Sequence, residues 1–229
     1  MQERRCAMVR RHHLGGDADG PEAVTRALIA LHASDPASVY LSVLARSTAS
    51  TLADVADAMY ERPNLVRWMA MRRTLFVFAR EDISTVQAAV STPLAAMLLR
   101  RLISRLRRNG CEPVIDGDDG RWLADLENRV DRVLARRGTA TDAQLADDVP
   151  ALRTLILAKA PSDRPQHVTT SLLTLMSADA RIVRGTPTGP WTSRHHRWEP
   201  LSRWCPEGLP PIDTAQAQRD LARSVSPRL

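Results

Sequence analysis

The order of the hydrophobic patterns is the feature that most constrains how this chain can fold. Twice along the sequence, segments whose apolar residues recur at helical spacing precede two short β-type segments joined by a polar turn. The first β pair covers residues 65–71 and 74–79, and the second covers 181–185 and 191–198. A chain with this order is expected to contain two units, each a helical cluster followed by a β-hairpin.

Three helices are predicted ahead of the first hairpin. One opens at Pro21, and a second opens at Asp35-Pro36, because aspartate is a good N-cap and proline suits the first helical position. A third begins at Ser50 or Thr51 and ends near Pro63. Three helices followed by a hairpin form the plan of a winged helix.

The second unit repeats this plan. A helix over 122–134 meets a stop signal at Gly138, and Thr141 with Gln144 is a capping-box signature for the next helix. Further helices are predicted over 150–159 and 168–180.

We therefore predict an α+β, predominantly helical fold of tandem winged-helix units. The first unit, 1–117, ends in a basic helix at 93–110, and the second unit covers 118–205. A tail with several prolines follows at 206–229.

The basic residues are almost all arginine. The chain has 32 lysine and arginine residues against 26 acidic ones, a formal charge of +6, and Lys159 is the only lysine. A GC-rich genome produces such a bias without functional meaning, but planar guanidinium groups also suit bidentate contacts to phosphate and guanine. The helix at 93–110 fits either a surface that follows a phosphate backbone or a solvated outer face.

Both predicted hairpins gather basic side chains near their turns. A turn of this kind can straddle phosphates or enter the minor groove of a duplex. We therefore predict contact with double-stranded DNA, largely independent of base sequence, through nine residues: Arg67, Arg72, Arg73, Thr74, Arg181, Arg184, Arg194, His195 and Arg197.

Several other classes of protein are disfavoured. Cys6, Cys111 and Cys205 lie far apart without CxxC spacing, which argues against a disulfide framework or a zinc site. His195 and His196 would point to opposite faces of a strand, which disfavours a shared metal ion. The longest apolar run, 94–99, is too short to cross a membrane. We expect a cytoplasmic, nucleoid-associated protein with no metal and no membrane partner, and the sequence leaves the oligomeric state open.

The segment 31–36 concentrates His32, Ser34 and Asp35 within four positions. Such a cluster could orient a water molecule for hydrolysis, with Asp35 or His32 as general base. It equally fits a helix cap, in which Ser34 or Asp35 caps the following helix and His32 packs beside it.

Several segments together resemble the bacterial winged-helix DNA-binding family that includes the AlkZ and YcaQ DNA glycosylases. They are 31–36, 65–67 with 71–76, and 181–185 with Trp191-Thr192, in the family's order. The resemblance implies tandem winged-helix units that form a concave basic surface for duplex DNA. It also implies a monofunctional glycosylase reaction, in which a positioned water attacks the deoxyribose C1′ of an alkylated or crosslinked nucleotide. No metal or organic cofactor is implied.

The chain departs from this family at the signature triplet and in length. The glycosylases carry Gln-aliphatic-Gln or Gln-aliphatic-Asp, whereas the matching positions here hold His32-Ala33-Ser34. The candidate catalytic residues are therefore His32, Ser34 and Asp35, of which Asp35, one position beyond the triplet, supplies the carboxylate. Family members continue through a third winged-helix unit and a β-rich part, so the helix that begins near Ala215 is expected to open a third unit in a truncated member.

Two hypotheses follow from the sequence. The chain is either a winged-helix protein that binds DNA without catalysis or a glycosylase of alkylated bases that uses His32 and Asp35.

Overall fold

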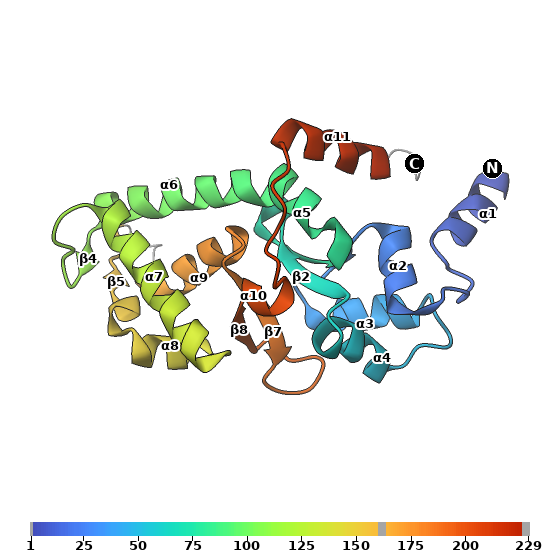
Figure 1. Cartoon of the computed structure of the whole chain (residues 1–229), viewed down its shortest axis with the longest axis horizontal. Helices are drawn as coiled ribbons and strands as arrows, with labels where there is room; N and C mark the ends of the chain where they lie inside the picture. Colours follow the sequence, from blue (N-terminus) through green and yellow to red (C-terminus); the bar gives the residue numbers. More distant parts are fainter. Residues whose placement is uncertain (1, 160–163, 226–229) are drawn as a thin grey trace. The chain divides into compact units, whose positions relative to one another are not determined.

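The computed structural model describes residues 2–159 and 164–225 and shows a mixed α/β protein in which helices predominate (Figure 1). The chain forms two compact units from interleaved segments. Unit 1 is Met1–Ser91, Gly185–His196 and Leu209–Leu229, and unit 2 is Thr92–Arg184 with Arg197–Gly208.

This division differs from the expected one, in which the unit boundaries lie after residues 117 and 205. The basic helix packs with unit 2, whereas the loop of the second hairpin and the C-terminal helix pack with unit 1. Residues 160–163 of the expected second unit and 226–229 of the expected tail lie outside the described residues.

A three-stranded antiparallel sheet lies at the centre of unit 1. Its strands are β1 (Leu31–His32), β2 (Leu65–Met69) and β3 (Leu75–Ala79), in the order β1-β3-β2. The hairpin of β2 and β3 confirms the sequence prediction, and its register pairs Trp68 with Phe76. The short strand β1 was not predicted. It extends the sheet because Leu31 pairs with Val77 and the next residue pairs with Phe76.

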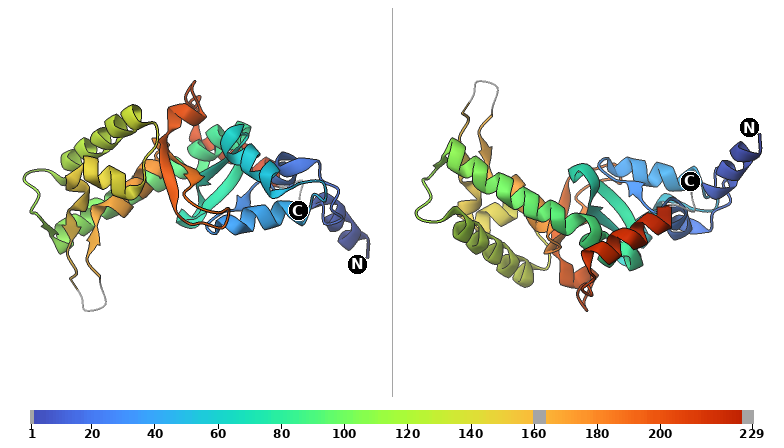
Figure 2. Two further views of the ribbon diagram at one scale, coloured as in Figure 1. Left: turned by 90° about the horizontal axis from the view of Figure 1, so that it is seen from below. Right: turned by 90° about the horizontal axis from the view of Figure 1, so that it is seen from above.

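Three helices of unit 1, α2, α3 and α4, begin at or next to the residues that the sequence predicted. The bounds in this unit are α1 (Gln2–Arg11), α2 (Gly20–Leu28), α3 (Pro36–Leu44), α4 (Leu52–Ala56), η1 (Asp57–Glu61), η3 (Arg80–Asp82), α5 (Ile83–Val86), η4 (Gln87–Ser91) and α11 (Thr214–Val225). Thr51 caps α4 in a reciprocal capping box with Asp54. The helix predicted near Ala215 is α11, which runs alongside α5 and η4 (Figure 2).

Unit 2 is built on the packing of α6 (Thr92–Asn109) against α7 (Asp119–Arg137) and α9 (Val168–Ala178). The other elements of this unit are β4 (Cys111–Glu112), α8 (Asp142–Asp148), η5 (Pro150–Arg153), β5 (Leu155–Ile156), β6 (Gln166–His167) and α10 (Leu201–Trp204). The strands β7 (Ile182–Pro187) and β8 (His196–Pro200) are divided between the units, with 182–184 and 197–200 in unit 2. Gly138 ends α7 and the Thr141–Gln144 capping box begins α8, as predicted.

Two predictions in this part of the chain are wrong. The helix expected over 150–159 is only the short η5, because β5 leaves the helical path and pairs with β4 on one side and β6 on the other. In the second hairpin the returning strand begins at His196 rather than at Trp191. Residues 188–195 therefore form a long loop between β7 and β8.

One continuous helical stretch, residues 80–109, meets the length and hydropathy expected of a membrane span. This is weak support for a membrane role, because core helices of other proteins meet the same criteria. The second half of the stretch is α6, which carries exposed arginines on one face and buries Ala95, Leu102 and Leu106 on the other.

The capping box of α8 gives a test of the fold. Thr141→Ala removes the side chain that accepts a hydrogen bond from the Gln144 amide, so we expect a loss of about 1 kcal/mol in the free energy of unfolding. For a chain of this size that loss lowers Tm by about 2–4 °C in a thermal melt. The matched control is Thr170→Ala on the exposed face of α9, which should leave Tm unchanged or slightly raised. An equal loss in both variants would contradict the assigned cap.

Candidate active site

The junction between β1 and α3 brings together the three candidate catalytic residues. His32 and Ser34 are exposed, Leu31 and Ala33 are buried, and Asp35 is half-buried. This pattern follows from β geometry, because successive side chains point to opposite faces of a sheet. The two polar side chains of the triplet therefore emerge on the same face.

The imidazole of His32 packs against the sheet. Its ring meets Phe76, its partner on β3, edge to face with centroids 5.4 Å apart. The contact limits the rotation of the imidazole and leaves it open to solvent.

Asp35 uses its two carboxylate oxygens differently. Oδ1 accepts a hydrogen bond of 3.2 Å from the amide of Ala37 and so caps α3, with Pro36 at the first helical position as predicted. Oδ2 lies 3.8 Å from Nη2 of Arg194. The arginine side chain is 77% exposed, so this pair contributes little to stability and can exchange its partner for another charge.

The loop between β7 and β8 contributes to this site from a distant part of the sequence. Trp191 packs on Tyr40 of α3 with ring centroids 5.2 Å apart, and Arg194 thereby lies beside Asp35. Within the loop, the amide of His195 donates to Ser193 Oγ at 3.2 Å, and the backbone amide of Thr188 donates to the His195 carbonyl at 3.0 Å. His195 itself is exposed.

Arg67 does not lie at a turn, which corrects its sequence assignment as a DNA contact. It sits within β2 and is only 4% exposed. Its Nη2 donates to the carbonyl of Ala33 at 3.1 Å. Arg67 therefore lies behind the candidate catalytic segment instead of on the surface.

The charge of Arg67 acts on two tyrosines. Burial raises the pKa of Tyr60 on η1, while the charge and side-chain contact of Arg67 act to lower it. Burial likewise raises the pKa of Tyr40, with the Arg67 charge again opposing. Both phenols are therefore neutral at physiological pH. Sequence patterns did not single out either tyrosine, because tertiary packing alone brings them to the site.

The turn between β2 and β3 carries the predicted basic pair. Arg72 and Arg73 are exposed, and both have a left-handed backbone with φ of 56° and 61°. Such a conformation is unfavourable for side chains with a Cβ. Thr74 closes the turn, because its Oγ1 donates to the Met71 carbonyl at 2.8 Å. The guanidinium groups of this turn are thus available for a ligand.

The arginines of unit 2 fall into two groups. Arg181 is held by α7: its Nη1 lies 2.5 Å from Glu127 and its Nε lies 3.0 Å from Asp131. This pairing offsets its charge within α7, and the DNA contact of Arg181 stays a prediction. Arg184 stacks over Trp198 at 5.1 Å, and Arg197 is half-buried on β8.

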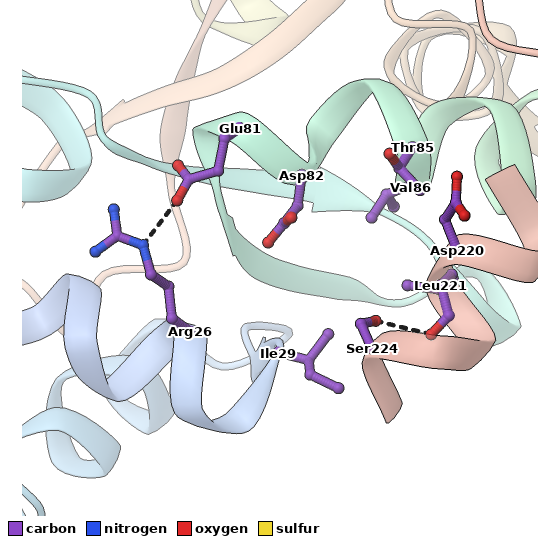
Figure 3. Close-up of a pocket in the computed structure, with 9 residues that line it drawn as sticks. All are labelled: Arg26, Ile29, Glu81, Asp82, Thr85, Val86, Asp220, Leu221 and Ser224. Carbon is purple, nitrogen blue, oxygen red and sulfur yellow. Dashed lines mark hydrogen bonds and ion pairs between the residues drawn. The ribbon is translucent and has the colours of Figure 1, made fainter. Parts of the chain in front are cut away.

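Unit 1 also contains a cavity of about 280 Å³ between α2, α5 and α11 (Figure 3). Arg26 Nε donates to Glu81 across its edge at 2.7 Å, and Ser224 donates to the Leu221 carbonyl at 2.8 Å. Burial acts to raise the pKa of Glu81, but the contacts with Arg26 and the backbone hold it below its ordinary value. Gln216 donates a hydrogen bond to the Asp220 carboxylate, and Arg223 forms an ion pair with it. Arg26, Glu81, Asp220 and Ser224 therefore all have partners within the protein.

Within residues 2–159 and 164–225 no group of three His, Cys, Asp or Glu side chains is arranged to hold a metal ion. The chemistry available at the β1–α3 junction is therefore that of an imidazole, a hydroxyl and a carboxylate close to a guanidinium.

Comparisons with known proteins give a family from the sequence and a similar fold from a solved structure. A sequence model of the AlkZ-like DNA glycosylase family matches residues 25–226. Among solved structures, the Streptomyces sahachiroi DNA glycosylase AlkZ superposes with a TM-score of 0.62 at 15% identity. The match covers 95% of this chain and 54% of that one, so the chain spans about half the length of that structure. No curated protein matches the chain. Because the family model covers most of the sequence, the chain belongs to the AlkZ-like DNA glycosylase family.

Proposed function

We propose that this chain binds duplex DNA and hydrolyses the glycosidic bond of alkylated nucleotides, with the reaction at the β1–α3 junction. The observation that carries the proposal is the exposure of His32 and Ser34 on one face, next to the half-buried carboxylate of Asp35. This segment holds His32-Ala33-Ser34 at the positions that match the family's signature triplet. Membership in the AlkZ-like family supports the same reaction.

The proposed reaction needs few groups because the substrate is already activated. Alkylation at N7 of guanine places a positive charge on the base, which weakens the bond from C1′ to N9. The enzyme has to bring the nucleotide out of the stack and to hold a water molecule at C1′. The water adds to C1′ as the C1′–N9 bond breaks, and the bonding electrons leave with the neutral base.

Asp35 is the proposed general base, and it accepts the proton of the attacking water. His32 is the proposed orienting group, which holds the water or a sugar oxygen, while Ser34 supplies a further hydrogen bond. For Asp35 to act, the oxygen that faces Arg194 must be released. A DNA phosphate that draws Arg194 away would release it.

The basic hairpin turns are the proposed contacts to the phosphate backbone. Each helical cluster with its hairpin acts in this proposal as a winged-helix unit. Arg72, Arg73 and Arg194 are exposed guanidinium groups between the strands of the two hairpins. Because phosphates are the same at every nucleotide, such contacts make binding largely independent of sequence. We propose that the protein works in the cytoplasm, on the nucleoid.

A second function, DNA binding without catalysis, is favoured by one observation. Asp35, the only carboxylate of the segment, caps α3 through Oδ1 and faces Arg194 through Oδ2. A carboxylate with both oxygens engaged serves structure alone unless DNA changes these contacts. Comparison of Asp35 variants separates the two functions.

Asp35→Asn is the decisive substitution for catalysis. Asparagine caps a helix as well as aspartate does, so the variant should keep its Tm while it loses the general base. We expect the single-turnover rate of N7-methylguanine release from duplex DNA to fall by a factor on the order of 100 or more. The measurement is chromatography of the free base after incubation with enzyme in excess.

Two further variants serve as controls for this measurement. His32→Ala should also slow the release, whereas His12→Ala, outside the junction, should not. Base release at the wild-type rate by Asp35→Asn would contradict the assigned role.

Binding of undamaged duplex DNA should depend steeply on salt, because each neutralised phosphate releases counterions. Replacing Arg72, Arg73, Arg194 and Arg197 with alanine should reduce the slope of log K against log[salt] by about 0.9 for each residue that contacts a phosphate. The control is Arg132→Ala with Arg136→Ala on the exposed face of α7. A slope that is the same in both sets, measured by fluorescence anisotropy, would rule out the hairpin turns as the contact.

A further inference from the structure

The strongest unexplained feature of unit 1 is the buried charge of Arg67. Only 4% of the residue is exposed to solvent. Its Nη2 donates to the neutral carbonyl of Ala33, its side chain contacts Tyr60, and its Nε has no hydrogen-bond partner within the described part of the chain. The nearby phenols of Tyr40 and Tyr60 are neutral, so they do not balance the charge.

A buried cation without a carboxylate partner is costly. Replacement of buried charges by apolar side chains of similar volume is often neutral or stabilising, so stability alone gives no reason for an arginine here. A buried polar group without a hydrogen-bond partner needs an explanation, and a role in function is one of them. The contacts of Arg67 therefore have to explain its presence.

Those contacts converge on one residue of the candidate catalytic segment. The amide of Ala33 donates to the Leu75 carbonyl on β3 at 2.8 Å, and the carbonyl of Ala33 accepts from Arg67 at 3.1 Å. Both backbone polar groups of Ala33 are thus fixed, one by the sheet and the other by the guanidinium. The orientation of Ala33 sets the direction in which His32 and Ser34 leave the backbone.

The segment has little else to hold it. β1 has only two residues and lies at the edge of the sheet, so it pairs on one side alone. Beyond Ala33 the next fixed point is the Asp35 cap of α3. A guanidinium is well suited to fix the residue between these points, because a charged donor makes a stronger hydrogen bond than a neutral one.

We propose that Arg67 is a positioning residue, whose buried guanidinium holds the Ala33 carbonyl and so fixes the His32–Asp35 segment in the geometry that the reaction needs. The side chain of Tyr60 on η1 contacts the guanidinium, and the phenol of Tyr40 on α3 lies within reach of its charge. The catalytic consequence rests on the proposed function, whereas the structural consequence can be measured without any reaction.

The test compares Arg67→Met, which keeps the volume and loses the donors, with Arg67→Lys, which keeps the charge. The matched control is Arg46→Met, since Arg46 also donates to a backbone carbonyl, that of Ser42, at 2.9 Å in the same unit. In amide hydrogen exchange without DNA, we expect the Ala33 amide of Arg67→Met to exchange at least about tenfold faster than in the wild type. The amides of Val77 and Phe78 should keep their wild-type rates, as should the Ala33 amide in Arg46→Met.

Activity and stability supply two more readouts. Arg67→Met should stay within about 4 °C of the wild-type Tm. Its single-turnover rate of base release should fall by a factor on the order of 100, while its Kd for undamaged duplex stays unchanged. Arg67→Lys should recover part of the lost rate. Absence of base release by the wild-type protein would refute the proposed function, and the exchange of the Ala33 amide would still decide the role of Arg67. An unchanged Ala33 amide, or equal acceleration at Ala33 and Val77, would overturn the proposal.

Discussion

The pairing of β1 with β3 is the interaction on which the candidate site depends. Its two residue pairs bury Leu31 and leave His32 exposed, and the next amide, that of Ala33, continues the pattern. Without this pairing the segment before α3 would be an unconstrained loop, and its polar side chains would have no common face. β1 lies at the sheet edge and pairs on one side only, and the guanidinium of Arg67 donates a hydrogen bond to the Ala33 carbonyl that follows it.

Charge is distributed between structure and surface in a way that composition cannot show. Arg181, Arg137 and Arg153 pair with carboxylates of their own unit, and these pairs account for part of the arginine excess without any ligand. Arg72 and Arg73 project from a turn with a left-handed backbone, where no such pair is recorded among the described residues. The proposed DNA-binding surface therefore rests on the position of these arginines and not on their number.

Local signals in the sequence predicted what local interactions determine. The caps at Asp35, Thr51 and Thr141 and the hairpin around Arg72-Arg73 depend on neighbours within a few positions, and all four are present.

The features that were missed depend on distant partners. β1 and β5 are too short to show a period, and each exists only because another strand lies beside it. Arg67 is a residue type that is typical of surface contacts, yet β2 is buried at all five positions and Arg67 lies inside. In the candidate site the triplet positions came from a family resemblance, whereas Trp191, Tyr40 and Arg194 came together only through the fold.

Simultaneous measurement of the two products from one duplex tests the central claim most directly. A hydrolytic glycosylase at the β1–α3 junction must release free N7-methylguanine and leave an abasic site in equal amounts, with no break in the strand from the enzyme itself. We expect equal yields of the two products from the wild-type protein in excess over DNA, quantified by mass spectrometry and by an abasic-site probe. Tight binding of the same duplex with neither product formed would contradict the account and would leave a DNA-binding protein without catalysis.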